Sequence, residues 1–177
     1  MGSEVGGGAV AGTSGPGIAD RLDHVSIATW RIASMVPLIR DALGARYLMG
    51  ATETAHGFRW AQFQFAGGGI IELIEPVGSQ GFVHDFLNKR GEGLHHFTLR
   101  VRDIATRSHE LEAAGWRPVK ANFENPVWKE FFIHPRQAHG VLIQLAESEL
   151  PYPKEVEHYQ QLDLDDLMAQ ERVERRP

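Results

Sequence analysis

The chain has 177 residues, of which 42% are hydrophobic and 23% are charged, and its net charge is −5 at pH 7. This composition is that of a soluble globular protein with one domain, or with two small halves that share a core. A net negative charge argues against non-specific nucleic-acid binding, which depends on a basic surface. The chain has no cysteine, so any metal must be held by nitrogen and oxygen ligands.

The sequence contains no apolar run of the roughly 18 residues that a membrane helix needs. Near the N-terminus no basic segment precedes an apolar core, so we expect no secretory signal, no membrane partner and a cytoplasmic location. Residues 1–19 are rich in glycine and are expected to form a flexible tail. Gly6-Gly7-Gly8 lacks the preceding strand and the following Lys-Ser/Thr of a phosphate-binding loop.

The first unit, residues 20–77, has the pattern of four strands and one helix. Alternating polarity predicts the strands, and apolar residues every three or four positions predict a helix that Gly44 ends. The predicted elements are a strand at 22–28, a helix at 32–43 and strands at 45–49, 58–65 and 70–74. Pro37 either kinks the helix or marks its true start. Gly67-Gly68-Gly69 is expected to form a hairpin turn.

A linker helix is predicted at residues 79–90, and a second unit of the same kind at residues 92–147. Its predicted elements are a strand at 94–101, a helix at 104–114 that Asp103 caps, and strands at 116–120, 128–134 and 141–146. The same step of 72 residues carries His24 onto His96 and Glu72 onto Gln144. The repeat predicts an α+β fold of two tandem βαβββ modules.

Residues 148–177 form a charged extension that begins with Pro151 and Pro153. Apolar residues between Val156 and Met168 recur at helical spacing, which predicts one amphipathic helix that packs on the domain or on a partner. The last residues are expected to fray.

The repeat places one ligand-type side chain on the first strand and one on the last strand of each unit. Two pseudo-symmetric sheets that face each other would bring these four side chains to one point. Imidazole, carboxylate and amide oxygen suit a divalent first-row metal such as Zn, Co, Mn, Ni or Fe. The predicted metal ligands are His24, Glu72, His96 and Gln144.

Each of these residues also has an ordinary structural interpretation. A lone histidine at the start of a strand usually forms only hydrogen bonds, and Gln144 alone would mean little. Glu72 lies between Ile71 and Leu73, where burying a carboxylate without a charged partner is costly. The repeated spacing therefore supports the metal site. His95 alternates to the other face and is expected to be structural.

Three stretches resemble the vicinal oxygen chelate (glyoxalase/bleomycin resistance) superfamily: Ile-Glu72-Leu-Ile-Glu-Pro, Gly-Glu-Gly-Leu-His-His96 and His-Pro…Gly-Val-Leu-Ile-Gln144-Leu. Within the superfamily the resemblance is strongest to methylmalonyl-CoA epimerases, over residues 20–147. It implies paired βαβββ modules in a cupped, incomplete barrel, one divalent metal, a small-molecule substrate and often a homodimer. The metal positions of the family map onto the four ligands predicted above.

The chain departs from the epimerase pattern at two positions. The last ligand of the family is normally a glutamate, and here it is Gln144; the family base on the third strand corresponds to Trp60. Racemisation at an α-carbon needs a base on each face of that carbon. Glu130 is a candidate proton-transfer residue, because the repeat places it on the face of Trp60 and Phe132. A surface salt bridge with Lys129 or an arginine is its alternative role.

The same face offers further side chains that would contact a substrate: Trp60, Gln62, Arg100 and Phe132. A solvated or turn-capping role remains open for Gln62 and Arg100. The leading functional hypothesis is a metal-dependent isomerase or epimerase acting next to a carbonyl, on an acyl-CoA such as methylmalonyl-CoA. The alternatives are another metal-dependent lyase, hydrolase or dioxygenase of this fold, or a non-catalytic binding protein of the resistance type. The lack of the family's glutamates at Trp60 and Gln144 favours a non-catalytic binding protein, whereas the complete set of four predicted metal ligands argues against it.

Overall fold

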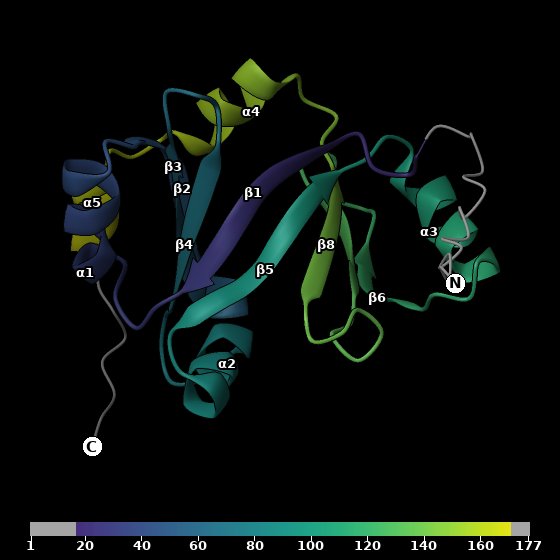
Figure 1. The fold of residues 1–177 in the computed structure, drawn as a ribbon. Helices are drawn as coiled ribbons and strands as arrows, with labels where there is room; N and C mark the ends of the chain where they lie inside the picture. The colour runs from purple at the N-terminus through teal and green to yellow at the C-terminus, as the bar shows by residue number, and fades with distance from the viewer. Residues whose placement is uncertain (1–16, 171–177) are drawn as a thin grey trace, which may run out of the picture.

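The computed structural model describes residues 17–170 (Figure 1). Most of the expected N-terminal tail and the expected frayed C-terminus therefore lie outside the described residues. No helix between residues 17 and 170 is long and apolar enough to cross a membrane.

The described residues form one curved, open sheet of eight strands in the order β2-β3-β4-β1-β5-β8-β7-β6 (Figure 1). At its centre β1 (Arg21–Ala28) pairs antiparallel with β5 (Gly93–Arg100). On either side, β1 runs parallel to β4 (Ile70–Pro76) and β5 runs parallel to β8 (Leu142–Glu147). The predicted pair of βαβββ modules is confirmed, and the two modules meet along β1 and β5.

The first module contains each predicted element. Besides β1 and β4, its elements are α1 (Ile32–Val36), η1 (Pro37–Ala42), β2 (Arg46–Glu53), η2 (Thr54–His56) and β3 (Phe58–Gln64). The helix continues past Pro37 as a π-helical turn, because proline lacks the N–H that a regular turn would use. Gly44, with φ of +77°, ends it as expected.

The second module repeats this order after the linker helix α2 (Phe82–Arg90). Besides β5 and β8, its elements are α3 (Ile104–Ala113), β6 (Pro118–Asn122) and β7 (Lys129–Ile133). The repeat extends to the helix caps. Glu75 Oε2 accepts a hydrogen bond from the Ile32 amide at 2.7 Å, and Glu147 Oε2 accepts one from the Ile104 amide at 2.9 Å.

Asp103 was expected to cap α3 and does not. It has a left-handed backbone (φ of 54°), and its side chain makes no capping hydrogen bond. A carboxylate from the last strand, Glu147, takes that role instead, where a negative charge also complements the helix dipole. The cap residue is therefore supplied by tertiary structure, which the local sequence does not reveal.

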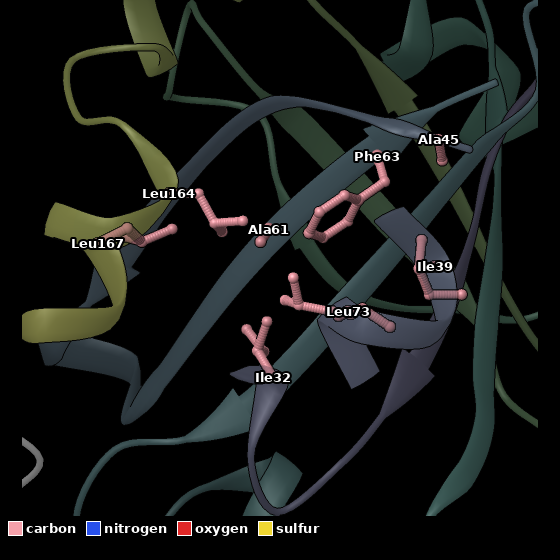
Figure 2. Close-up of a cluster of buried hydrophobic side chains, with 9 residues drawn as sticks. Ile32, Ile39, Ala45, Ala61, Phe63, Leu73, Leu164 and Leu167 are labelled. Carbon is pink, nitrogen blue, oxygen red and sulfur yellow. The ribbon is translucent and has the colours of Figure 1, made fainter. Parts of the chain in front are cut away.

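The outer face of the sheet packs against helices. In the first module, α1, η1 and the C-terminal helix α5 (Leu164–Ala169) cover an apolar cluster on β3 and β4, in which Phe63 and Leu73 are fully buried (Figure 2). In the second module, Ile104 of α3 packs against Phe131 and Leu145. Because side chains alternate along a strand, these contacts leave the other face of the sheet for polar residues and for a second apolar cluster that includes Trp60 and Ile74. We call this other face the inner face; it lines the cup.

The C-terminal extension forms two short helices, so the expectation of one continuous helix is wrong. They are α4 (Tyr152–Tyr159) and α5 (Leu164–Ala169). Asp163 starts the second helix by accepting a hydrogen bond from the Asp166 amide at 2.8 Å. We call residues 148–170 the C-terminal strap.

The strap passes around the edge strand β2. Tyr159 of α4 packs near Trp60 on the inner face, whereas Leu167 of α5 packs beside α1 on the outer face (Figure 1). Gly50 of β2 makes this close approach possible. A Cβ there would lie 2.7 Å from Cδ2 of Leu167 and 2.6 Å from the backbone oxygen of Trp60.

Candidate metal centre

Three of the four predicted ligands meet on the inner face, where β1, β4 and β5 lie side by side. One ligand atom each from His24, Glu72 and His96 lies within 4.8 Å of the other two. Nε2 of His24 is 3.6 Å from Oε2 of Glu72, and Nε2 of His96 is 3.9 Å from Oε1 of Glu72. The side chains are nearly inaccessible to solvent, with residue exposures of 2%, 8% and 7%. The structure thus gathers two imidazoles and a carboxylate around one point.

Hydrogen bonds to the far nitrogens orient both imidazoles. Nδ1 of His24 lies 3.0 Å from Oδ2 of Asp23, and Nδ1 of His96 lies 2.8 Å from Nδ1 of His95. Both rings therefore direct Nε2 toward Glu72. Metal-binding histidines are commonly oriented in this way, by a hydrogen bond to the ring nitrogen that does not bind the metal. His95 does not join the cluster and packs against Phe86, with ring centroids 4.7 Å apart.

The two histidines have opposite pKa shifts. Burial opposes the charge on His24, but Glu72 and Asp23 together raise its pKa above the ordinary value. Burial lowers the pKa of His96 well below its ordinary value, and the charges of His24 and His95 add to that effect. A single positive charge is therefore stabilised beside Glu72, which is the electrostatic environment that a bound cation requires.

Gln144, the fourth predicted ligand, contacts the cluster through a side-chain hydrogen bond with His96 and reaches His24 through Thr98. Its Oε1 accepts a hydrogen bond from the hydroxyl of Thr98, and that hydroxyl oxygen lies 2.9 Å from Nε2 of His24. Its Nε2 donates to Oε2 of Glu130 at 2.5 Å. Gln144 thus connects the cluster to Glu130.

Two buried polar atoms near the cluster have no hydrogen-bond partner among the described residues. They are Oγ of Ser26, which lies opposite both Glu72 and His96 in the sheet register, and Oε1 of Gln62. The amide Nε2 of Gln62 donates to Oε2 of Glu72 at 3.1 Å. Buried polar atoms are normally paired, so the orphaned oxygens indicate a polar occupant. The donor set and these oxygens together fit a divalent metal with its bound water.

Glu130 lies on β7 at the border of this cluster. Its carboxylate accepts hydrogen bonds from Trp128 Nε1 at 2.9 Å and from Gln144. Burial raises its pKa, and these two hydrogen bonds only partly offset that effect. Lys129 instead pairs with Glu149 at 2.6 Å, so the alternative of a Lys129–Glu130 salt bridge is wrong.

The other predicted substrate contacts lie on the inner face, but they differ in whether other protein groups already contact them. Phe132 is partly buried opposite Gln144 in the sheet register. Gln62 lies within the cluster. Trp60 packs against Tyr159 of the strap, with ring centroids 5.1 Å apart, and Arg100 donates hydrogen bonds to Asp23 and to Glu155.

Sequence reasoning missed several residues of the site. Thr98 follows His96 by two positions on an alternating strand, so the same face assignment that selected Arg100 would have found it. Trp128 stacks near His24, with ring centroids 6.4 Å apart, and no sequence pattern indicated that contact. Glu155 lies on the strap, whose position depends wholly on tertiary packing.

The sequence profile of the Glyoxalase/Bleomycin resistance protein/Dioxygenase superfamily matches residues 23–132. The chain belongs to this superfamily. The matched residues include most of β1 and all of β4 and β5, which carry the cluster, whereas the strap lies beyond them. The sequence resemblance to the superfamily is confirmed.

Individual relatives match most of the chain. The uncharacterized protein YqjC of Bacillus subtilis is 35% identical over 133 residues, which cover 72% of this chain and 92% of YqjC. The ethylmalonyl-CoA/methylmalonyl-CoA epimerase of Cereibacter sphaeroides is 31% identical and covers 72% of this chain and 97% of the relative. The crystal structure of methylmalonyl-CoA epimerase from Mycobacterium tuberculosis superposes with a TM-score of 0.69 at 30% identity, over 77% of this chain and 93% of that one.

Proposed function

We propose that the protein is a metal-dependent enzyme that removes and returns a proton on the carbon next to a carbonyl, in an acyl-CoA substrate such as methylmalonyl-CoA. The observation that supports this most directly is the His24–Glu72–His96 cluster with the buried carboxylate of Glu130 beside it. The epimerases among the relatives favour an acyl-CoA as the substrate class.

His24, Glu72 and His96 would hold the metal through two imidazole nitrogens and a carboxylate oxygen. Zn, Co, Mn, Ni and Fe all accept this donor set. When bound, the ion would supply Lewis-acid stabilisation of negative charge on the substrate oxygens.

Glu130 would be the base. Because its pKa is raised by burial, its ionised form is a stronger base than an ordinary carboxylate. Trp128 and Gln144 both bind Oε2 of Glu130, which leaves Oε1 to take the proton. Abstraction converts Glu130 to the carboxylic acid and the substrate to an enolate. The acid proton exchanges with solvent, and its return to the same carbon restores the carboxylate and the acyl-CoA.

Because positions 60 and 144 carry Trp60 and Gln144 in place of carboxylates, Glu130 is left as the single proposed base. A single base favours proton exchange or transfer on one face of the substrate, and epimerisation needs a second proton donor on the opposite face. We therefore expect α-proton exchange to be faster than inversion of configuration.

The test is incorporation of deuterium into methylmalonyl-CoA by the metal-loaded protein in deuterated water, followed by NMR. We expect exchange that chelation abolishes and that Glu130→Gln reduces at least a hundredfold while metal content is retained. Glu149→Gln is the matched control, because it removes a half-exposed carboxylate that pairs with Lys129. Absence of exchange in protein with bound metal would reject the proposal.

A second function is consistent with the same cluster. Two histidines and one carboxylate also form the site of non-haem iron oxygenases. Iron in the purified protein, together with oxygen consumption in the presence of a candidate substrate, would favour that function. Metal analysis of the purified protein also separates both enzymes from a metal-free binding protein.

We also propose that the protein is a homodimer, on the basis of the family resemblance. Light scattering coupled to size-exclusion chromatography measures the mass directly. A mass near the 19.7 kDa of one chain would contradict the dimer.

A further inference from the structure

The strap covers part of the inner face that the sequence predicts to contact substrate. At one end of α4, Tyr159 lies edge-on to Trp60 with centroids 5.1 Å apart, and Val156 packs on the same apolar cluster. In the middle of the helix, Glu155 accepts a hydrogen bond from Nη2 of Arg100. The helix therefore spans from β3 of the first module to the central strand β5, and it occupies two predicted substrate contacts.

Arg100 is held in place as a carboxylate-binding group. Its Nε donates to Oδ1 of Asp23 at 3.0 Å, its Nη2 donates to Glu155, and its guanidinium carbon lies 4.5 Å from the ring centroid of Trp128. Arg100 is 7% exposed and Glu155 is 1% exposed. A carboxylate buried to this extent needs a charged partner, so the pair with Arg100 accounts for the buried position of Glu155.

A cavity of about 170 Å³ lies directly beside this pair. Its lining includes Arg100, Glu155, Arg21, Arg102 and Tyr152. The hydroxyl of Tyr152 is buried and has no hydrogen-bond partner among the described residues. Since one water takes up about 30 Å³ in the liquid, the cavity has room for a small carboxylate. The unpartnered hydroxyl supplies a hydrogen-bond donor for it. Arg21 already pairs with Asp23, and Arg102 pairs with Asp20, which also lines the cavity, so Arg100 is the guanidinium for which a ligand would compete with Glu155.

We propose that Arg100 is a carboxylate-recognition residue, that Glu155 is its internal occupant, and that a small carboxylate entering the cavity replaces Glu155 and frees α4 from the inner face. The exchange leaves Arg100 paired with two carboxylates throughout, so the guanidinium is never left buried without a partner. Glu155, once displaced, is on a short helix near the surface and can be solvated. The ligand thereby opens the cup above the cluster.

Hydrogen exchange of residues 152–159, measured by mass spectrometry on the zinc-loaded protein, tests this. Malonate should increase the exchange rate of α4 at least fivefold, and malonamide, which has the same shape without charge, should not. Glu155→Gln should increase the rate without any ligand. Glu157→Gln is the control on the same helix, because Glu157 is exposed and pairs with the exposed Lys154 at 2.7 Å, and this variant should behave like the wild type.

Arg100→Gln and Arg100→Lys identify where malonate acts. Arg100→Lys retains the positive charge and should keep a reduced response, and Arg100→Gln should abolish the response. An undiminished response in both variants would place malonate at the metal cluster and overturn the proposal. So would an unchanged exchange rate in Glu155→Gln. Backbone hydrogen exchange of α4 does not depend on catalytic turnover. Failure of this proposal can therefore be distinguished from failure of the proposed reaction.

Discussion

The hydroxyl oxygen of Thr98 lies 2.9 Å from Nε2 of His24. The hydroxyl proton is donated to Gln144, which leaves the Thr98 oxygen to accept a hydrogen bond from Nε2 of His24 whenever that nitrogen is protonated. Gln144 in turn donates to Glu130 at 2.5 Å. When Nε2 of His24, the nitrogen that would bind a metal, carries a proton, hydrogen bonds through Thr98 and Gln144 connect it to the proposed base.

Metal binding should therefore release a proton from His24. Glu72 and Asp23 raise the pKa of His24 above its ordinary value, so a proton competes with the metal for this imidazole. Affinity should fall as the pH decreases through this raised pKa. Calorimetric titration with zinc in two buffers of different ionisation enthalpy counts the protons. A value near zero would mean that His24 is not a ligand.

Substitutions should separate the ligands from Gln144. We expect His24→Ala, Glu72→Ala and His96→Ala each to lower zinc content to background, because two remaining ligands hold zinc poorly. Gln144→Ala should lower affinity by less than tenfold, since its oxygen is already bonded to Thr98, and should mainly slow proton exchange through Glu130. His109→Ala, on the exposed face of α3, is the control. Zinc content is measured by plasma mass spectrometry, and equal loss in all variants would contradict this division of roles.

Asp23 should make the metal-free protein sensitive to acid. Burial opposes its ionisation, yet the hydrogen bond from His24 and the charge of Arg100 lower its pKa to about 2, from a model-peptide value of 3.8. A lowered carboxyl pKa adds stability that is fully present above about pH 4 and is lost as the pH falls toward 2. The amount is about 2 kcal/mol.

Urea unfolding between pH 6 and pH 3 measures this effect. The difference in free energy of unfolding between wild type and Asp23→Asn should shrink as the pH decreases. A difference that does not change with pH would show that Asp23 titrates alike in the folded and unfolded chain.

Gly50→Ala should loosen the strap. Its Cβ would lie 2.6 Å from the backbone oxygen of Trp60, which cannot shift without distorting β3, and 2.7 Å from Leu167. Overpacking of this kind lowers the free energy of unfolding by roughly 1–3 kcal/mol. Gly67→Ala is the control, because a Cβ there meets no atom within 4 Å. Equal midpoints in urea for both variants would contradict the close packing of α5 on β2.

The sequence was sufficient for those parts of the site that depend on local periodicity and on the repeat. His24 and His96 are equivalent under the 72-residue step, and so are Glu72 and Gln144, and alternation along each strand assigned their faces. The same logic would have given Thr98. It could not give Glu155 or the Glu147 cap of α3, because these contacts join segments that no local pattern relates. The same logic could not predict that the strap forms two helices, because the apolar spacing continues through the break between α4 and α5, where no signal other than Asp163 appears.

Because the strap follows the domain in the sequence, its position affects when a metal can reach the cluster during synthesis. Domains fold from the N-terminal side during synthesis, so β1, β4 and β5 leave the ribosome before α4 does. The cluster is thus complete while the cup is still uncovered, and a metal ion can enter it without crossing the strap. If α4, which contacts Trp60 and Arg100 on the inner face, limits access to the cluster, exchange of that ion would require release of α4. The first metal that a newly made chain encounters would then be retained, so metal availability during translation would determine which ion the mature protein carries.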